Sequence, residues 1–314
     1  MQDLGIVAGQ LMDSGLKAST LKTYASAQRS YLQFCESYSL TPVPTSDATL
    51  LLYVAFLFRR GLKGSSIKVY LAGVRNLHVV RSLPYPDYSP QLQLALRGAV
   101  KLSDPPERKL PITFSVLSRM FEYLQGRHDE LMLKTVMAVA YFGCFRAGEL
   151  CLQDSLKFDS SLHLTCGDVT FHVNDKFFTL LLKSSKTDVA GKGVPVHVGC
   201  SGHEICAFCL LLEYSSCHID FANKVLPLFM DVNGTVLRNS YFQATTKLLL
   251  AASGFDSSKY SGHSYRAGSA TSAADSGFSE WELKMLGRWA SDAYAVYLRN
   301  PKIVNSFAKR LTKY

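Results

Sequence analysis

Histidine, arginine, tryptophan and tyrosine stand in three short motifs whose chemistry suits a phosphodiester. GHSYRAG holds His263 and Arg266 three residues apart, on one face of a helix. YFGCFRAGEL places Arg146 at the end of a very apolar segment, where a charge is costly unless an anion meets it. LGRWASDAYAVYLRNP adds Trp289 and Tyr297. Arginine binds non-bridging phosphate oxygens bidentately and tyrosine forms a reversible phosphoester, so these residue types indicate chemistry on a phosphodiester.

Taken in order, these motifs resemble those of the tyrosine recombinase (phage integrase) family. The family pattern is an arginine in an R-x-x-E-L setting, a β-hairpin lysine, H-x-x-R, a histidine or tryptophan, and a nucleophilic tyrosine. The corresponding residues are Arg146 with Glu149, Lys186, His263 with Arg266, Trp289 and Tyr297. Packing or helix capping explains each residue taken alone, whereas all of them in this order are specific. SKTD and GRW-x-SDAY look closest to the eukaryotic mobile-element branch (Crypton-like and DIRS-like elements).

The resemblance implies an enzyme that cuts and rejoins duplex DNA. Tyr297 would attack the scissile phosphate, forming a 3′-phosphotyrosyl bond and releasing a 5′-hydroxyl. Arg146 and Arg266 would stabilise the charge of the transition state. His263 would accept a proton and bind the phosphate, and Lys186 would act as general acid. Because the bond energy is kept in the phosphotyrosine, the resemblance implies neither a cofactor nor a metal.

Two further residues complete this predicted site. Trp289 would pack beside the nucleophile and donate its indole N–H to the phosphate, and Glu149 would orient the site. Many family members place nine residues between the His/Trp position and the tyrosine, whereas Tyr297 follows Trp289 by eight. Tyr294, five residues after Trp289, is therefore an alternative nucleophile. The stretch YLRNP resembles the family's sequence after the nucleophile and favours Tyr297.

The lysine has alternatives as well. Lys183 and Lys192 flank Lys186 in the segment KSSKTDVAGK. The turn position of Lys186 and the Thr-Asp that follows it favour Lys186 as the general acid.

Helices must position the first part of the chain. Apolar residues at helical spacing predict an all-α core-binding domain over residues 1–102, with Ser19 capping one helix and Asp47 opening the next. The segment SDPPERKLPIT, residues 103–113, combines prolines with charges and predicts an interdomain linker.

The remainder, residues 114–314, is predicted to be a mixed α+β catalytic domain. LHLTCGDVTFHV, FFTLLLKSS and VPVHV have strand-like patterns, and helices are expected from about residue 203 to the end. The predicted fold is thus mainly α with a small antiparallel β-sheet. In residues 302–314, apolar positions recur at helical spacing and predict a C-terminal tail helix.

Charge is concentrated in the first third of the chain. The formal net charge is +9, and residues 1–102 hold 11 Lys/Arg against 5 Asp/Glu. A basic domain suggests a polyanion partner, although a surface tuned for solubility would look the same. With the resemblance, double-stranded DNA is the expected partner, bound by a homo-oligomer (a tetramer) on synapsed DNA. The expected DNA-binding residues are Lys17, Lys22, Arg29, Lys63, Lys68 and Arg75.

Eight cysteines without regular spacing suit reduced thiols in an intracellular protein. If the host is a eukaryote, we expect the protein to act in the nucleus. CSGHEICAFC spaces Cys200, His203, Cys206 and Cys209 as potential zinc ligands, with Cys217 and His218 after them. We expect these three-residue steps to point around one helix, which would not close a tetrahedron. The sequence therefore predicts buried apolar cysteines and no metal.

Other classes of protein are less compatible with the sequence. The longest apolar run, residues 50–58, is too short to cross a membrane, and no secretory signal is expected. A type IB topoisomerase-like enzyme that relaxes single duplexes would use the same chemistry. A host-adopted DNA-binding protein that no longer recombines is the other alternative.

Overall fold

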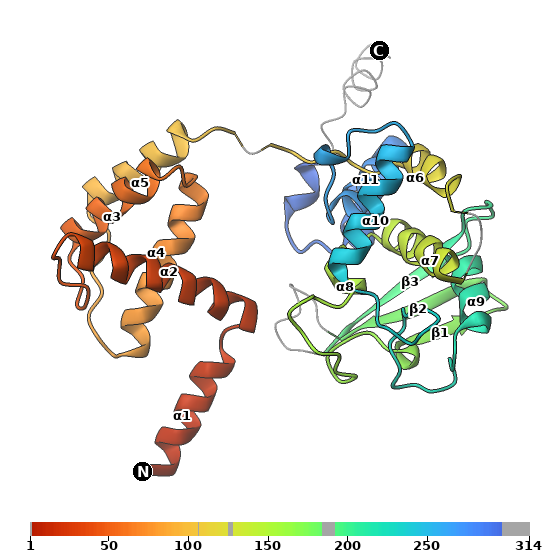
Figure 1. The fold of residues 1–314 in the computed structure, drawn as a ribbon, viewed down its shortest axis with the longest axis horizontal. Helices are drawn as coiled ribbons and strands as arrows, with labels where there is room; N and C mark the ends of the chain where they lie inside the picture. Colours follow the sequence, from red (N-terminus) through yellow and green to blue (C-terminus); the bar gives the residue numbers. More distant parts are fainter. Residues whose placement is uncertain (1, 106, 125–127, 184–191, 297–314) are drawn as a thin grey trace. The chain divides into compact units, whose positions relative to one another are not determined.

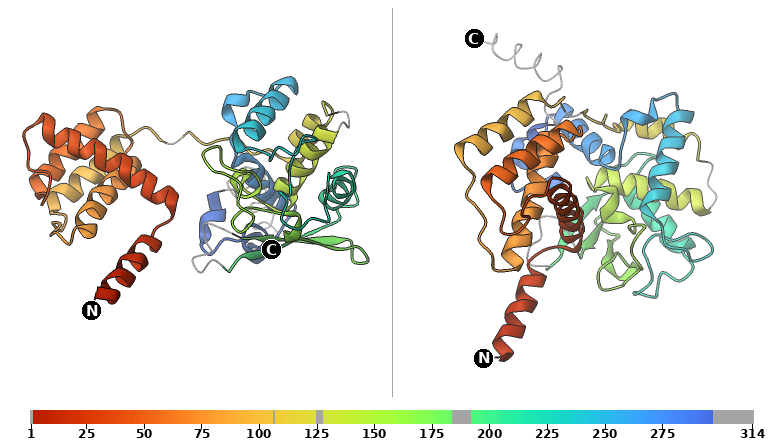
Figure 2. Two further views of the ribbon diagram at one scale, coloured as in Figure 1. Left: turned by 60° about the horizontal axis from the view of Figure 1, so that its bottom comes forward. Right: turned by 60° about the vertical axis from the view of Figure 1, so that its left-hand side comes forward.

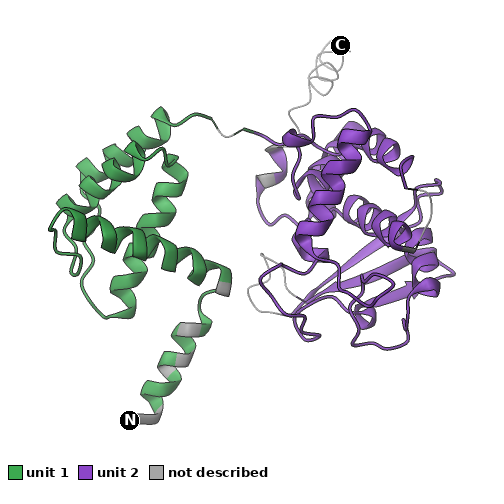
Figure 3. Cartoon of the chain, in the orientation of Figure 1, with its two compact units in different colours: residues 1–107 green, residues 108–314 purple. Residues whose placement is uncertain are grey.

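The chain folds into two compact units, residues 1–107 (unit 1) and 108–314 (unit 2), drawn in different colours in Figure 3. The computed structural model describes residues 2–105, 107–124, 128–183 and 192–296. Lys186, Tyr297 and the predicted tail helix lie outside the described residues.

Unit 1 is all-α. Its helices are α1 (Gln2–Ser14), α2 (Ala18–Ser37), α3 (Asp47–Arg59), α4 (Gly64–Val80) and α5 (Pro90–Leu102), shown in Figure 1. The rings of Tyr31 and Tyr53 meet edge to face in its core, 5.1 Å between centroids. Gly73 lets α4 approach α2 closely, since a Cβ there would stand 2.7 Å from the Cβ of Ala27.

Serine side chains cap two of these helices, though not at the predicted residue. Ser46 Oγ accepts from the amide of Thr49 at the start of α3, and Ser89 Oγ accepts from Leu92 at the start of α5. Ser19 does not cap α2. The N-cap residue is Lys17 instead. Its backbone is extended, its carbonyl accepts the first hydrogen bonds of the helix, and the helix begins at Ala18.

Unit 2 combines helices with one small sheet. Its helices are α6 (Phe114–Phe121), α7 (His128–Phe142), α8 (Ala147–Leu150), α9 (Ala207–Cys217), α10 (Asn239–Ala252), α11 (Ser264–Asp275) and α12 (Glu280–Gly287). Short 3-10 helices are η1 (Cys166–Asp168), η2 (Ser257–Lys259) and η3 (Asp292–Val296), and the strands are β1 (Val169–His172), β2 (Phe177–Leu182) and β3 (Val194–Gly199). In Figures 1 and 2 the strands lie along one side of the unit.

The sheet has the order β1-β2-β3, with both pairs antiparallel. Alternate residues of β2, namely Phe178, Leu180 and Leu182, are buried in the core that α7 and α9 share. This alternation buries one face of the strand. The predicted mainly helical fold with a small antiparallel sheet is confirmed.

Two predicted elements differ from the structure. The strand expected over LHLTCGDVTFHV is confined to β1, because the carboxylate of Asp168 accepts from the amide and hydroxyl of Thr165 and closes η1. Helix does not continue through residues 218–238. There, Asp231 Oδ1 accepts from the amides of Asn233 and Thr235 and forms a turn.

The helices of the structure were also compared with the length and apolarity that a membrane span needs. Across the described ranges, none of them combines the length and the apolarity needed to cross a bilayer.

Candidate active site

Two segments far apart in sequence meet at the start of α8. The tight turn after α7 includes Cys144 at a positive φ of 50°, which is uncommon for a residue other than glycine. Arg146 follows this turn. The amide of Ala147 donates to the carbonyl of Gly262 at 3.2 Å, so the residue after Arg146 is bonded to the residue before His263. The arginine and histidine motifs therefore lie at one place in the fold.

Glu149 holds Arg146 through both its oxygens. Its Oε1 accepts from Arg146 Nη1 at 2.6 Å, and its Oε2 accepts from the Arg146 backbone amide at 2.9 Å. The Glu149 side chain is 8% exposed and that of Arg146 is 25% exposed. The carboxylate is therefore shielded while the guanidinium keeps access to solvent, which is the geometry that an orienting role for Glu149 requires.

Arg266 is buried in the first turn of α11 and joins two other segments. Its Nη1 donates to the carbonyl of Cys144 at 2.9 Å, and its Nη2 donates to the carbonyl of Gly287. Its guanidinium also lies over the ring of Trp289, 4.8 Å from the centroid. These contacts tie the turn before Arg146 to the C-terminal end of α12.

Arg288 is a site residue that the motif analysis missed. Its Nη1 donates to the carbonyl of Gly143 at 2.8 Å, its Nη2 donates to that of Cys144 at 3.0 Å, and the same Nη2 lies 3.4 Å from Glu149 Oε2. Burial lowers the pKa of this guanidinium, and the Glu149 carboxylate acts in the opposite direction.

A spacing signal could have found Arg288. Tyr297 follows Arg288 by nine residues, which is the spacing that many family members have between the His/Trp position and the tyrosine. Arg288 has a positive φ of 53° and ends α12, so the chain turns there and the next residue, Trp289, faces Arg266.

Tyr294, the alternative nucleophile, is a packed residue. Its side chain is buried with Leu283 and lies 6.3 Å from the Trp289 ring, centroid to centroid. Its hydrogen bond with Glu280 raises the pKa of the phenol, and burial raises it further. A phenol with a raised pKa forms the attacking phenolate less readily.

His263 is exposed at the N-terminal end of α11. Its backbone amide donates to Ser261 Oγ at 3.3 Å, and its carbonyl accepts from the amide of Ala267 at 3.0 Å. The first-turn amides and the dipole of this 12-residue helix favour an anion beside His263.

The small residues of α11 allow a close approach from one side. A Cβ on Gly268 would lie 1.7 Å from the carbonyl oxygen of Ile112, so only glycine fits there. The amide of Ile112 in turn donates to the carbonyl of Ser264 at 2.9 Å. The helix that holds His263 and Arg266 is therefore packed directly against the segment that enters unit 2.

Of the lysines considered as general acid, Lys183 has a structural role. Its Nζ lies 2.7 Å from Asp168 Oδ2 and donates to the carbonyls of Ser160 and His163 at 2.7 and 3.2 Å. These bonds fix the ammonium against the loop before β1. Lys192 is exposed, and Lys186 remains a prediction outside the described residues.

The basic residues predicted to bind DNA are exposed in unit 1. Lys17 precedes α2, which carries Lys22 and Arg29, and Lys63 precedes α4, which carries Lys68 and Arg75. Each pair within a helix is seven residues apart and so shares a helix face. Arg29 also lines a hollow of about 440 Å³ together with Arg60, which the motif analysis did not single out.

The cysteine motif is not wound around one helix, contrary to the prediction. Cys200 follows β3, Cys206 is the N-cap of α9, and Cys209 lies in the first turn of that helix. Gly202, at a positive φ of 69°, reverses the loop between strand and helix. His218 lies elsewhere, with its Nε2 3.6 Å from Cys166 Sγ.

No protein-family model matches this sequence. Among curated proteins, the chain is similar to an integrase/recombinase xerD homolog from Selenomonas ruminantium. The two are 23% identical over 284 residues, which cover 86% of this chain and 78% of that protein.

Solved structures of DNA-bound proteins have a similar fold. The Tn1549 transposon integrase in complex with circular intermediate DNA matches with a TM-score of 0.62 at 14% identity, over 96% of this chain and 97% of that one. The XerH site-specific recombinase bound to difH substrate matches with a TM-score of 0.58 at 15% identity, over 91% and 78%. The lambda integrase bound to DNA matches with a TM-score of 0.56 at 16% identity, over 94% of each chain. The similarity in fold therefore spans nearly the whole chain.

Proposed function

We propose, on the premise that this chain belongs to the tyrosine recombinase family, that it is a site-specific DNA recombinase acting through a 3′-phosphotyrosyl intermediate. The observation that carries the proposal is that three distant segments bring Arg146, His263, Arg266 and Trp289 together. The Ala147 amide bonds to the Gly262 carbonyl, and Arg266 bonds to the Cys144 and Gly287 carbonyls and lies over the Trp289 ring. Isolated motifs that arose by chance would not be expected to meet in space.

Tyr297 is the proposed nucleophile. Its phenolate oxygen attacks the phosphorus, a phosphorus–oxygen bond forms, and the bond to the 5′-oxygen breaks. Lys186 donates the proton that the leaving 5′-oxygen needs. Attack by a 5′-hydroxyl on the phosphotyrosine reverses these steps and rejoins the strand without external energy. The packing of Tyr294 and the bonding of Lys183 support this choice between the alternatives.

The arginines provide the positive charge for the transition state. Arg146 is the accessible donor, and Glu149 holds it in one orientation. Arg266 reaches the phosphate by exchanging its bond to the Gly287 carbonyl for one to a non-bridging oxygen. His263 accepts a proton from the nucleophile and binds the phosphate at the N-terminal end of α11.

The same proposal extends to the partner and the assembly. Unit 1 binds the backbone of duplex DNA through the exposed lysines and arginines of α2 and α4. Two DNA sites are brought together by a homotetramer, with residues 302–314 docking on a neighbouring protomer. The similarity of SKTD and GRW-x-SDAY to eukaryotic mobile elements supports a eukaryotic host, in which the reaction would take place in the nucleus.

Covalent capture on a nicked duplex tests this function. The unmodified chain and Tyr294→Phe should form a protein–DNA adduct, whereas Tyr297→Phe should form none and still bind DNA, because only a hydroxyl is lost. Adducts from Tyr297→Phe together with none from Tyr294→Phe would reverse the assignment. Strand exchange between two duplexes then distinguishes a recombinase from a topoisomerase. If neither the unmodified chain nor either variant forms an adduct, the proposed cleavage reaction is wrong and only the DNA-binding function is left.

A further inference from the structure

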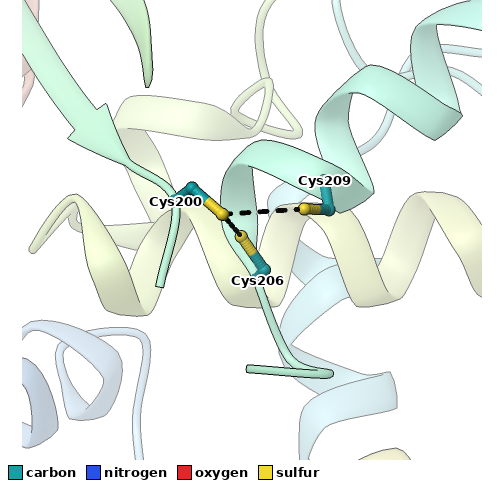
Figure 4. Close-up of side chains that lie close together, drawn as sticks. All are labelled: Cys200, Cys206 and Cys209. Atoms are coloured by element: carbon teal, nitrogen blue, oxygen red, sulfur yellow. Dashed lines mark hydrogen bonds between the residues drawn. The ribbon is translucent and has the colours of Figure 1, made fainter. Parts of the chain in front are cut away.

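Three cysteine sulfurs meet where β3 ends and α9 begins (Figure 4). Cys200 Sγ lies 3.5 Å from Cys206 Sγ and 3.9 Å from Cys209 Sγ, and the three sulfurs all lie within 4.8 Å of one another. The turn at Gly202 makes this possible, since it folds Cys200 back toward the helix. The cluster is separate from the residues around Arg146 that the proposed reaction uses.

The spacing of the sulfurs fits one tetrahedral metal ion. Zinc–thiolate bonds of about 2.3 Å imply a sulfur–sulfur separation of about 3.8 Å in a tetrahedron. A disulfide requires about 2.05 Å between two sulfurs and leaves the third without a partner. The separations of Cys200 from Cys206 and Cys209, 3.5 and 3.9 Å, lie on either side of the tetrahedral value, and the third separation is within 4.8 Å.

The surroundings of Cys206 suit a thiolate. Its Sγ accepts a hydrogen bond from the amide of Ser201 at 3.4 Å, the kind of contact that supports a metal-bound sulfur. Cys206 is also the N-cap of α9, an 11-residue helix whose N-terminal dipole favours negative charge. Cys206 is buried whereas Cys209 is exposed, so an ion can reach the cluster from the side of Cys209.

We propose that Cys200, Cys206 and Cys209 bind a zinc ion as thiolates, with His203 as the fourth ligand. The thiol protons are released to solvent as the ion binds, and no electron is transferred. Four protein ligands make a closed site of the structural type. The ion would join β3 to α9, and α9 packs along α7, the helix that leads to the turn before Arg146.

His203 lies in the loop between two of the proposed thiolate ligands and would have to turn toward them to bind the ion. It is exposed in the loop between Cys200 and Cys206, and its ring meets the ring of Phe114 edge-on at 5.0 Å. Its Nδ1 accepts from the amide of Ile205 at 3.1 Å, so this nitrogen carries the lone pair that a metal requires. Rotation of the exposed side chain would exchange that hydrogen bond for a bond to zinc.

Metal analysis of the full chain tests the proposal. Protein purified under reducing conditions with zinc sulfate should retain one zinc per chain, measured by mass spectrometry of the metal. Replacement by Co²⁺ should give the visible bands of a tetrahedral ion and the near-ultraviolet bands of cobalt–thiolate bonds. A chelator should lower the Tm of unit 2 by several degrees, because a ligand that binds only the folded state stabilises it.

Single substitutions identify the ligands. Cys200→Ser and Cys209→Ser should weaken Co²⁺ binding by more than the roughly 10- to 100-fold that loss of an outer contact costs. His203→Ala should keep the thiolate bands but change the tetrahedral ones. Cys217→Ser removes an exposed cysteine at the other end of α9 and should bind like the unmodified chain. Cys209 is exposed, so its substitution should leave the fold intact even if that of buried Cys206 does not.

The proposal would be overturned by a reduced, folded chain that binds neither ion. A disulfide that persists between two of the three cysteines in the purified protein, with no zinc bound after its reduction, would overturn it as well. Co²⁺ bands that are unchanged by His203→Ala would overturn the fourth ligand. The readouts are metal content and Tm, so these results do not depend on the proposed recombinase activity.

Discussion

Cations are placed differently in the two units of this chain. In unit 1 the lysines and arginines of α2 and α4 are exposed, and the buried Tyr31 hydroxyl donates to Thr45 Oγ1 at 2.6 Å. In unit 2 the Arg266 side chain is buried against backbone carbonyls, and the Arg288 side chain is only 13% exposed. Exposed charges act over distance and are screened by salt, whereas buried ones act through fixed geometry. Substitutions should therefore change DNA affinity in unit 1 and the reaction or the folding in unit 2.

The largest effect should come from Arg266→Lys. Lysine keeps the charge but cannot hold the Cys144 carbonyl with one nitrogen while a second nitrogen exchanges the Gly287 carbonyl for the phosphate, and it stacks less well on Trp289. We expect covalent cleavage to slow by about 100- to 1000-fold, the cost of losing one oriented transition-state donor, with DNA binding nearly unchanged. Single-turnover cleavage of a nicked substrate measures the change.

Arg238→Lys is the matched control for that substitution. Arg238 also donates to two backbone carbonyls, those of Asp154 and Leu156, although from a single nitrogen, and it lies outside the site. Similar losses in both variants would mean that arginine–carbonyl bonds support the fold and have no special part in the reaction.

Glu149→Gln should have the next largest effect. The amide keeps the size of the carboxylate but loses its charge beside Arg146 and Arg288. Breaking a buried ion pair leaves an uncompensated charge, so we expect the free energy of unfolding to fall by about 3 kcal/mol. Urea denaturation measures it. Glu280→Gln weakens the exposed contacts of Glu280 with Lys284 and Tyr294 and should change stability much less.

Glycine-to-alanine substitutions should change stability in opposite directions in the two units. Gly268→Ala places a methyl group against the Ile112 carbonyl and should destabilise unit 2 by about 1–3 kcal/mol. Gly98→Ala, in α5 of unit 1, meets nothing within 4 Å and should stabilise by about 0.5 kcal/mol. Thermal unfolding compares the two. A neutral Gly268→Ala would show that α11 and the entering segment can separate.

The smallest effects should follow single charge removals in unit 1. Arg29→Gln and Lys68→Gln should weaken DNA binding modestly at all sequences, and each should reduce the slope of log affinity against log salt by about one. Titrations at several salt concentrations measure the slope. Lys157→Gln, an exposed change in unit 2, provides the comparison. An unchanged slope for Arg29→Gln would remove α2 from the DNA-binding surface.

Sequence reasoning worked best where residues act within one element or one motif. Helical spacing and strand alternation predicted the fold class, and the order of motifs selected residues such as Arg146 and His263, which the structure brings together. It missed Arg288, because the motif pattern assigned this position to Trp289. The left-handed backbone of Arg288 turns its guanidinium to carbonyls that precede it by more than a hundred residues, which the sequence does not indicate.

The cysteines show a second way in which sequence reasoning failed, since it predicted one helix where the chain forms a loop. A three-residue step predicts a helix face only if the helix is present, and here the chain from Cys200 to Cys206 is a loop reversed at Gly202. Likewise, the bond between Lys183 and Asp168 joins a strand end to a 3-10 helix, and no local pattern indicates it. Contacts between elements depend on how turns bring them together, which composition and periodicity do not encode.

The entry of the chain into unit 2 limits where its length can vary. Leu110 and Ile112 donate to the carbonyls of Lys259 and Ser264 at 2.7 and 2.9 Å, and the Ile112 carbonyl fills the space beside Gly268. A residue inserted before Arg108 only lengthens the segment that connects the two units. A residue inserted between Leu110 and Ile112 shifts by one residue the pairing of this segment with Lys259 and Ser264. The shift moves a side chain into the narrow space beside Gly268. Natural length variation among relatives should therefore accumulate before Arg108 and be rare after it.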